Sequence, residues 1–378
     1  MPEPLAGIYV HIPFCVKKCG YCDFYSITKL DSIDEFVRAL VIEIQLTAPA
    51  YDSLCFDTIY MGGGTPSILN NSHLQTIWDS LHHHFHIQPA GEFTIEANPG
   101  TLDLAKLSFL RNLGFNRLSL GAQSFHQSDL SFLERIHSVG DIINNFEASR
   151  RAGFENINID LMTAFPHLSK DRFRYSLEQV IALDPEHLSC YTLILEPNTK
   201  FYKRFKKGEF SPLNSDQEAD FYEMTIQILD RAGFSAYEIS NFARETRWQC
   251  QHNMKYWKHV PYIGFGPSAH SFKSPDRWRN ALTLAAYVKN LNQGKLPVVQ
   301  REKLTGQTLE FEYIFLHLRL RDGLNKLEYQ QRFRKNFTDT YMGKLKPFFS
   351  SGLMEQEGDF VRLSKRGWML ADEIVSSI

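Results

Sequence analysis

Three cysteines near the start of the chain have the spacing of metal ligands. They form the pattern Cys15-x3-Cys19-x2-Cys22, after an apolar run and within a Lys- and Gly-containing loop. Two classes of metal fit three thiolates on one loop, zinc or an iron–sulfur cluster. Structural zinc takes a fourth protein ligand, and no second cysteine pair follows at zinc-ribbon spacing. A cubane cluster on three cysteines leaves one iron open, so the loop favours a [4Fe–4S] cluster that can do chemistry.

A glycine run and several later polar residues are candidates for a ligand site beside that loop. The run Gly62-Gly63-Gly64 lies after an apolar segment and allows close approach of a ligand to the backbone. It lacks the lysine of a phosphate loop and the GxGxxG order of a dinucleotide site. Glu96, Gln123 and Asp160 each lie at or just after a later apolar run, where ligand groups gather in a βα barrel.

The elements that must position these residues are short apolar runs alternating with amphipathic helical segments. The runs that predict strands are Gly7–Ile12, Phe56–Met61, Phe93–Ala97, Arg117–Gly121, Asn156–Met162, His187–Leu195 and Ala236–Ile239. The patterns that predict helices include Ser32–Thr47, Ser72–His84, Leu104–Leu113, Val139–Ala152 and Lys170–Leu183. Such repetition predicts an α/β fold with a parallel sheet, either doubly wound or a barrel. Roughly six βα units favour a partial (β/α)6 barrel.

The rest of the chain has a different composition, so we expect three parts, 1–243, 244–300 and 301–378. Residues 244–300 are crowded with aromatic and histidine side chains and predict a connector. Residues 301–378 predict a small helical domain, with helices over Leu309–Leu320 and Asn325–Asn336 and a hairpin turning at Gly358-Asp359. Helices with such a hairpin suggest a winged helix. For the role of this domain, packing against the rest of the chain or binding a partner is favoured over nucleic-acid binding.

Composition points to a cytoplasmic protein with no nucleic-acid partner. The formal net charge is −2, which gives no electrostatic reason to expect nucleic acid or an anionic membrane. Neither a secretory signal nor an apolar run long enough for a transmembrane segment is present. The remaining cysteines, Cys55, Cys190 and Cys250, are scattered and predict reduced thiols.

Together the motifs resemble the radical S-adenosylmethionine (SAM) family, and within it the oxygen-independent coproporphyrinogen III oxidase group. The matching stretches are His11-Ile12-Pro13-Phe14-Cys15, Gly62-Gly63-Gly64-Thr65-Pro66, Glu96-x-Asn98-Pro99, Arg117 to Phe125, and Asp160-Leu161-Met162. The resemblance implies a partial radical-SAM barrel whose Cys15, Cys19 and Cys22 hold one [4Fe–4S] cluster, with SAM on the open iron. In that family one electron from the cluster splits SAM and yields a 5′-deoxyadenosyl radical.

The resemblance also implies roles for individual residues that occupy the same motif positions as the family's SAM-binding residues. The resemblance implies that Tyr9, Gly63 and Glu96 hold the SAM at the cluster. A second set matches positions that contact a second SAM in the oxidases: Tyr21, Gly64, Thr65, Gln123, Arg135 and Asp160. From the residues alone, an exposed ion pair is the favoured interpretation of Arg135.

Two departures point to the haem-chaperone (HemW-type) branch of this family. The oxidases carry a fourth cysteine two residues after the third, where this chain has Phe24, and they have a longer N-terminal extension. The branch implies haem as cargo, an acceptor protein that receives it, and a reductant for the cluster. A radical SAM coproporphyrinogen III dehydrogenase, which converts propionates to vinyl groups, is the alternative. A third possibility is a purely structural cluster beside a C-terminal docking domain.

The stretch His252-Asn253-Met254-Lys255-Tyr256-Trp257 separates these alternatives. It resembles the HNxxYW haem motif of the chaperone branch, which makes His252 the predicted ligand of the haem iron. Haem iron also accepts cysteine and tyrosine, so Cys250 and Tyr256 remain alternatives.

Overall fold

The computed structural model describes residues 5–377, and its framework is one twelve-stranded sheet in the order β12-β11-β10-β9-β1-β2-β3-β4-β5-β6-β8-β7. The strands β1 to β6 are parallel neighbours in chain order. Their bounds are β1 Ala6–Ile12, β2 Cys55–Gly63, β3 His86–Ala97, β4 Arg117–Gln123, β5 Asn156–Thr163 and β6 His187–Thr192. This confirms the predicted partial barrel of parallel strands.

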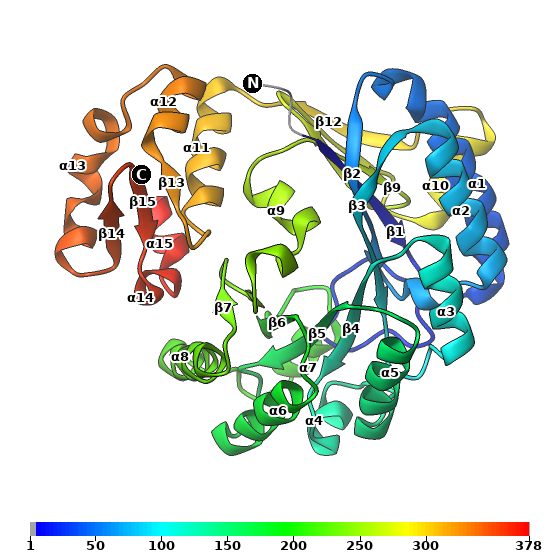
Figure 1. The fold of residues 1–378 in the computed structure, drawn as a ribbon, viewed down its shortest axis with the longest axis horizontal. Helices are drawn as coiled ribbons and strands as arrows, with labels where there is room; N and C mark the ends of the chain where they lie inside the picture. Colours follow the sequence, from blue (N-terminus) through cyan, green and yellow to red (C-terminus); the bar gives the residue numbers. More distant parts are fainter. Residues whose placement is uncertain (1–4, 378) are drawn as a thin grey trace.

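Helices cover the outer, convex face of this curved sheet (Figure 1). They are α1 Ile33–Thr47, α2 Asn71–His84, α3 Leu104–Leu113, α4 Gln127–Phe132, α5 Val139–Arg151, α6 Lys170–Ala182 and α8 Ser215–Arg231. The short helix α7 Lys200–Lys206 lies apart from this layer, with Lys200 and Lys203 in the lining of a cavity. Short 3-10 helices are η1 Leu30–Ser32, η2 Ala48–Tyr51 and η3 Pro66–Ile68. Every residue of β1 except Tyr9 is buried, since helices cover one face and the interior of the barrel lies against the other. The five helices predicted in this region match to within about one residue at each end.

Short strands extend the barrel at both open edges. Next to β6 lie β7 Ser235–Ala236 and β8 Asn241–Ala243, which are antiparallel. The predicted bounds Ala236–Ile239 are therefore wrong: only Ala236 lies in a strand, at the end of β7, and the chain pairs again in β8, beyond the predicted range. Next to β1 lie β9 Tyr262–Phe265, which is parallel to β1, then β10 His270–Lys273, β11 Asp276–Asn280 and β12 Val298–Lys303 in antiparallel order.

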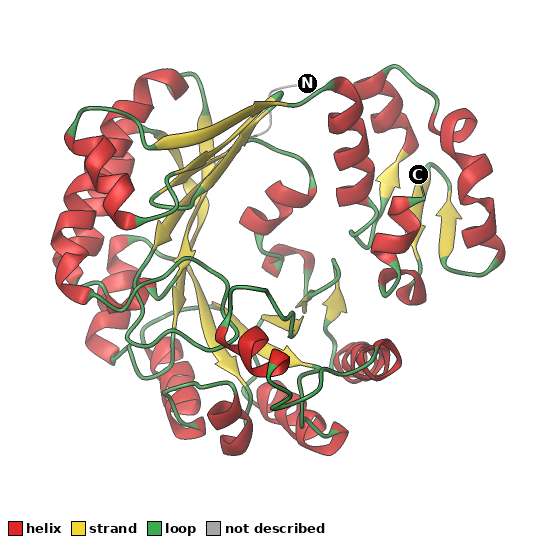
Figure 2. Ribbon diagram, turned by 180° about the vertical axis from the view of Figure 1, so that it is seen from behind, coloured by secondary structure: helices red, strands yellow, loops and turns green. Residues whose placement is uncertain are grey.

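The segment predicted as an aromatic connector thus contributes strands to the main sheet. It also contains η4 Thr246–Trp248, α9 Gln251–Trp257 and α10 Leu284–Asn292. Both ribbon views place α9 within the concave side of the sheet, between the strands and α11 (Figures 1 and 2). The domain limits at 243 and 300 stay a prediction.

The C-terminal part combines helices with a three-stranded sheet in the order β13-β15-β14. The elements are α11 Gly306–His317, β13 Leu324–Asn325, α12 Lys326–Phe333, α13 Phe337–Ser350, β14 Met354–Glu357, β15 Phe360–Leu363, α14 Lys365–Trp368 and α15 Ala371–Ser376. The predicted hairpin is present. This part has its own apolar core, which also packs against Tyr222, Ala236 and Ile239 of the barrel.

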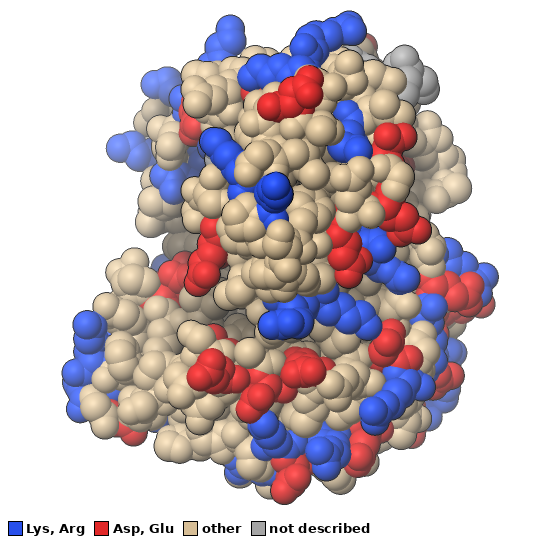
Figure 3. All heavy atoms as spheres, turned by 90° about the vertical axis from the view of Figure 1, so that its left-hand side faces the viewer, with Lys and Arg blue, Asp and Glu red and all other residues tan. Residues whose placement is uncertain are grey.

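The molecular face that carries these C-terminal elements shows interspersed basic and acidic side chains (Figure 3). Between Leu5 and Ser377, no helix is both long and apolar enough to span a bilayer.

Candidate functional site

The cysteine loop connects β1 to α1 and is held by backbone hydrogen bonds. The N–H of Cys15 donates to the Ile27 carbonyl at 3.0 Å, and the N–H of Ile27 donates to Pro13 at 2.8 Å. The N–H of Cys22 donates to the Cys19 carbonyl at 3.2 Å. All three cysteines are free thiols. The loop is therefore ordered by its own backbone, with three sulfur atoms available to a metal group.

The glycine run packs directly beneath this loop. The N–H of Gly64 donates to Ile12 at 2.8 Å, and the N–H of Thr65 donates to Phe14 at 2.7 Å. A Cβ on Gly64 would lie 2.5 Å from the Phe14 carbonyl oxygen, and one on Gly63 would lie 2.4 Å from the His11 ring. The glycines are thus required by close packing against the cysteine loop itself, a contact that the sequence did not indicate.

One cavity of about 490 Å³ contains the three cysteines and most of the predicted SAM residues. The predicted residues that line it are Tyr21, Gly63, Gly64, Thr65, Glu96, Gln123, Arg135 and Asp160. Tyr21 comes from the cysteine loop itself, and the others come from β2, β3, β4 and β5 near their carboxyl ends and from the segment after α4. The carboxyl ends of parallel strands meet at one edge of a barrel, which is why residues so distant in sequence share a cavity.

Arg135 joins the cysteine loop to the strand ends. Its Nη2 donates to the Asn98 Oδ1 at 2.6 Å and to the Gly121 carbonyl at 2.8 Å. Its Nη1 lies 3.3 Å from the Cys19 Sγ. The Thr65 hydroxyl lies 3.6 Å from the Cys15 Sγ and accepts from the Asn98 side chain at 2.9 Å. Arg135 is part of this buried network, so the ion-pair interpretation of its role is wrong.

Two carboxylates lie in the interior of the same cavity. Glu96 accepts from the Tyr60 hydroxyl at 2.8 Å and from the Gly63 N–H at 3.1 Å. Burial raises the pKa of Glu96 to about 7 despite these donors. Asp160 accepts from Asn158 at 2.7 Å, and burial raises its pKa as well. Both groups are positioned to receive a cationic or hydrogen-bonding part of a ligand.

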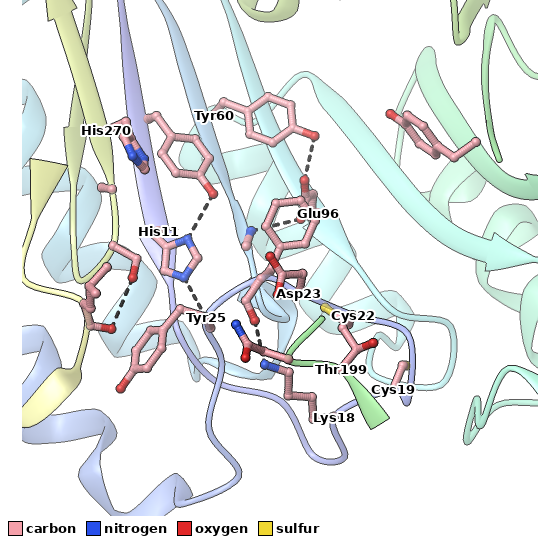
Figure 4. Close-up of a pocket in the computed structure, with 18 of the residues that line it drawn as sticks. His11, Lys18, Cys19, Cys22, Asp23, Tyr25, Tyr60, Glu96, Thr199 and His270 are labelled. Carbon is pink, nitrogen blue, oxygen red and sulfur yellow. Dashed lines mark hydrogen bonds between the residues drawn. The ribbon is translucent and has the colours of Figure 1, made fainter. Parts of the chain in front are cut away.

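A second cavity, of about 1240 Å³, adjoins the first. The two share Phe24, Tyr60, Gly63 and Glu96 in their walls. Figure 4 shows this larger cavity, with Cys19, Cys22 and Lys18 below Glu96 and with His11 and His270 on the opposite wall. Predicted residues Tyr9 and His252 line only the larger cavity. The Tyr9 hydroxyl contacts the His11 Nδ1 at 3.1 Å.

His252, on α9, is fully buried in the wall of the larger cavity. Its Nδ1 lies 2.8 Å from the Thr58 hydroxyl, and its Nε2 lies 2.8 Å from the Tyr256 hydroxyl. The ring stacks on Tyr60 with centroids 5.3 Å apart. Burial lowers the pKa of His252 to about 3, so the ring is neutral. Both of its nitrogens are engaged in this structure.

Cys250 and Tyr256, the alternatives to His252, have different positions. The Cys250 Sγ faces Glu92 at 3.6 Å and lies outside the lining of the larger cavity, whereas Tyr256 belongs to that lining. Burial raises the pKa of Cys250 to about 12, so its thiol is protonated.

Sequence reasoning missed many residues in these walls, among them Tyr60, Arg117 and Tyr191. Tyr60 and Tyr191 lie near the carboxyl ends of β2 and β6, and the strand-end rule that selected Glu96 could have found them. Arg117 is a buried arginine at the start of β4. Its Nε forms an ion pair with Glu92 at 4.0 Å, whereas among the described residues the buried Nε of Arg135 has no hydrogen-bond partner. Buried unpaired donors of this kind fit an anionic group of a ligand.

The cysteine loop also fits a cubane cluster. The three thiols line one cavity, and two of them receive the N–H and O–H contacts described above, which tune cluster sulfurs in iron–sulfur proteins. In residues 5–377 no three His, Cys, Asp or Glu side chains are arranged around a single metal ion. A cubane puts each cysteine on its own iron, so its ligands need not converge on one point.

Comparison with known proteins gives the class to which this fold and site belong. The sequence model of the radical SAM superfamily matches residues 9–180, and that of the HemN C-terminal domain matches residues 304–370. A solved structure of coproporphyrinogen III oxidase HemN from Escherichia coli, described as a radical SAM enzyme, superposes with a TM-score of 0.88 at 25% identity. The match covers 100% of this chain and 90% of that one. These matches define a radical SAM fold with a HemN-type C-terminal domain.

Relatives that match over nearly the full length of the chain identify the family within the radical SAM class. The chain is 33% identical over 374 residues to the heme chaperone HemW of Bacillus subtilis (strain 168), with 98% of both chains covered. It is 34% identical over 382 residues to the heme chaperone HemW of Mycobacterium tuberculosis (strain H37Rv), covering 100% of this chain and 96% of that one. The chain belongs to the HemW heme chaperone family. Membership of the radical SAM superfamily implies a [4Fe–4S] cluster and SAM.

Proposed function

We propose that this chain is a cytoplasmic haem chaperone. It holds a [4Fe–4S] cluster and SAM in the smaller cavity, binds haem in the larger one, and passes the haem to an acceptor protein. The observation that carries the proposal is the larger cavity itself, which shares walls with the cofactor cavity and is bordered by the HNxxYW helix. Its volume is sufficient for a large flat ligand, since small-molecule sites usually occupy about 300–1,000 Å³.

The cofactor cavity supplies groups suited to SAM. Cys15, Cys19 and Cys22 would hold the cluster, which when reduced donates the electron that cleaves SAM. The Glu96 carboxylate, already oriented by Tyr60 and Gly63, suits the amino group of SAM. The buried Nε of Arg135, which has no hydrogen-bond partner among the described residues, suits a carboxylate.

The larger cavity supplies groups suited to haem. Tyr60, Tyr256 and Tyr262 provide aromatic surface, and Lys200 and Lys203 on α7 provide positive charge for the two propionates. His252 is the predicted iron ligand. Ligation through its Nε2 requires the Tyr256 hydroxyl to leave the position that it occupies 2.8 Å away.

The alternative function is oxidative decarboxylation of coproporphyrinogen III. The full-length structural match to HemN supports it, and both functions use the same cofactor cavity. Phe24 argues against it, because it occupies the position of the oxidases' fourth cysteine; the side chain is 65% exposed and borders both cavities.

One experiment separates these functions. The cluster is reconstituted without oxygen, and the protein is given SAM, a reductant and coproporphyrinogen III while product is followed by mass spectrometry. In parallel, haem is titrated and followed by its Soret band. We expect one haem per chain and no vinyl product. Vinyl product without stoichiometric haem binding would establish the dehydrogenase and reject the chaperone.

A further inference from the structure

The larger cavity contains three histidines, His11, His252 and His270, and they differ in what their rings can do. His11 is 4% exposed, and both of its ring nitrogens have partners, the Tyr9 hydroxyl at 3.1 Å and the Tyr25 carbonyl at 2.8 Å. His252 is fully buried with both nitrogens engaged, as described above. Neither can bind a metal without breaking a buried hydrogen bond, which costs about 1–3 kcal/mol for each group left unpaired.

His270 is the exposed member of the three. It is the first residue of β10 and follows the turn that connects β9 to β10. In Figure 4 it lies near His11, on the wall opposite Thr199 and the start of α7. A flat ligand inserted between these walls would have His270 on one side and the α7 lysines on the other.

The surroundings of His270 favour the form that binds iron. Burial lowers the pKa of His270, and the nearby Arg279 and Arg277 lower it further, so the ring is neutral at neutral pH. A neutral imidazole keeps a lone pair on one ring nitrogen, which is the form of histidine that binds a metal.

We propose that His270 is an axial ligand of the haem iron in the larger cavity, and that His252 and His11 form its walls. This inference rests on the proposed haem-binding function and deepens it. The iron would bind the one cavity histidine that is accessible from solvent, so haem could enter and leave without disrupting the Thr58–His252–Tyr256 network. A chaperone must release its cargo, and an accessible ligand suits that requirement.

The test compares variants of the full-length, cluster-loaded protein titrated with ferric haem. Binding is followed by the Soret band and ligation by low-temperature EPR, in which the oxidised [4Fe–4S] cluster is silent. We expect His270→Ala to lose the histidine-ligated signal and to bind haem at least about tenfold more weakly, the loss seen even when only a partner of a metal ligand is removed. His83→Ala, an exposed histidine on α2 outside the cavity, is the matched control and should be unchanged.

A rescue experiment distinguishes ligation from a structural effect. In His270→Gly, added imidazole should restore the EPR signal, whereas in His252→Gly it should not. Cluster loading and the thermal midpoint verify that each variant is folded. Wild-type EPR and affinity in His270→Ala, or imidazole rescue confined to His252→Gly, would overturn the assignment and leave the chaperone function standing. Failure of the wild-type chain to bind haem would overturn both.

Discussion

At the scale of single residues, the site depends on polar contacts between side chains that approach from different strands. Arg135 reaches the Cys19 sulfur, Asn98 and the Gly121 carbonyl from one guanidinium. A planar fork with fixed donors suits this task, and a lysine could not satisfy three such partners in the same geometry. The cysteine loop is therefore fastened to β3 and β4 through a single side chain, in addition to its own backbone bonds.

The cysteines themselves give the first prediction. Replacing Cys19 by serine removes one of three cluster ligands, so we expect reconstituted protein to lose most of its iron and its broad visible absorption. Cys55→Ser is the control, because Cys55 is an exposed free thiol at the start of β2 that lines neither cavity. Iron content and absorbance after anaerobic desalting measure both. Equal iron in the two variants would contradict the assignment of Cys19.

At the scale of elements, the close contact between the β1 and β2 loops shapes the site. Gly64 lies against the backbone of the cysteine loop so closely that any side chain would collide with the Phe14 carbonyl. Backbone atoms at that distance cannot move aside independently of the loop. The absence of side chains in the glycine run thus lets the cysteine loop pack directly against the end of β2.

We therefore expect Gly64→Ala to lower the free energy of unfolding by about 1–3 kcal/mol, as overpacking usually does. It should also impair cluster loading. Gly343→Ala is the matched control: Gly343 is an exposed position within α13 where a Cβ meets nothing within 4 Å. That substitution should stabilise the protein by roughly 0.5–1 kcal/mol. Urea denaturation of both variants gives the comparison, and a neutral Gly64→Ala would refute the packing argument.

A buried carboxyl group connects three further elements near the larger cavity. Glu43 on α1 accepts from the Gly266 N–H at 2.8 Å, from Asn280 at 2.5 Å and from the Tyr287 hydroxyl at 2.5 Å. These bonds hold the turn before β10, β11 and α10 against α1. Burial raises the pKa of Glu43 from 4.5 to about 7, against the effect of its hydrogen bonds.

This shift predicts a pH-dependent stability. Below about pH 4.5 Glu43 is protonated in both states; between there and pH 7 the folded protein holds a proton that the unfolded chain has released. The stabilisation that comes from keeping Glu43 protonated is therefore present at low pH. The free energy of unfolding falls by about 3 kcal/mol in total as pH rises to about 7. Glu43→Gln cannot titrate, so the wild-type stability relative to that variant should decline over this range. Parallel pH profiles from chemical denaturation would contradict the prediction.

At the scale of the whole molecule, the concave side of the barrel is occupied by α9, and α9 also contacts α11 of the C-terminal part. His259, just after α9, lies 3.2 Å from the Arg332 side chain of α12. The wall of the larger cavity is thus supported on one side by the sheet and on the other by the C-terminal helices. Opposite this wall, α7 carries Lys200, Lys203, Arg204 and Lys206.

The α7 charges give a prediction about haem entry. Lys203 is exposed at the cavity wall, so Lys203→Glu should repel the haem propionates and weaken haem binding by about fivefold at low salt. The effect should shrink as salt is added, because the distance over which exposed charges interact falls from about 30 Å at 0.01 M to about 3 Å at 1 M. Lys346→Glu, an exposed site on α13 outside the cavity, is the control. A salt-independent or equal loss in both variants, measured by Soret titration, would exclude an electrostatic role.

Local patterns in the sequence were sufficient to predict the barrel and the cysteine loop. Strand burial and helix amphipathicity repeat over short distances, so β1 to β6 were located and five of the helices were predicted with nearly correct bounds. The bounds of two strands were wrong: β3 begins at His86 instead of Phe93, and β6 ends at Thr192 instead of Leu195. Glu96, Gln123 and Asp160 were also predicted to share a site, because each lies near the end of a strand and parallel strands bring their carboxyl ends to one edge.

The tertiary structure decided what those residues can do. The short strands β8 and β9 join the main sheet by pairing with β6 and β1, which are distant in the sequence, and no local signal marks such pairing. His252 shows the same dependence: its nitrogen is bonded to Thr58, which is 194 residues away in the chain. Its sequence motif predicts an iron ligand, but hydrogen-bond occupancy and solvent access depend on the packed neighbours. Hydrogen-bond occupancy and solvent access, both set by tertiary packing, favour His270 as the iron ligand.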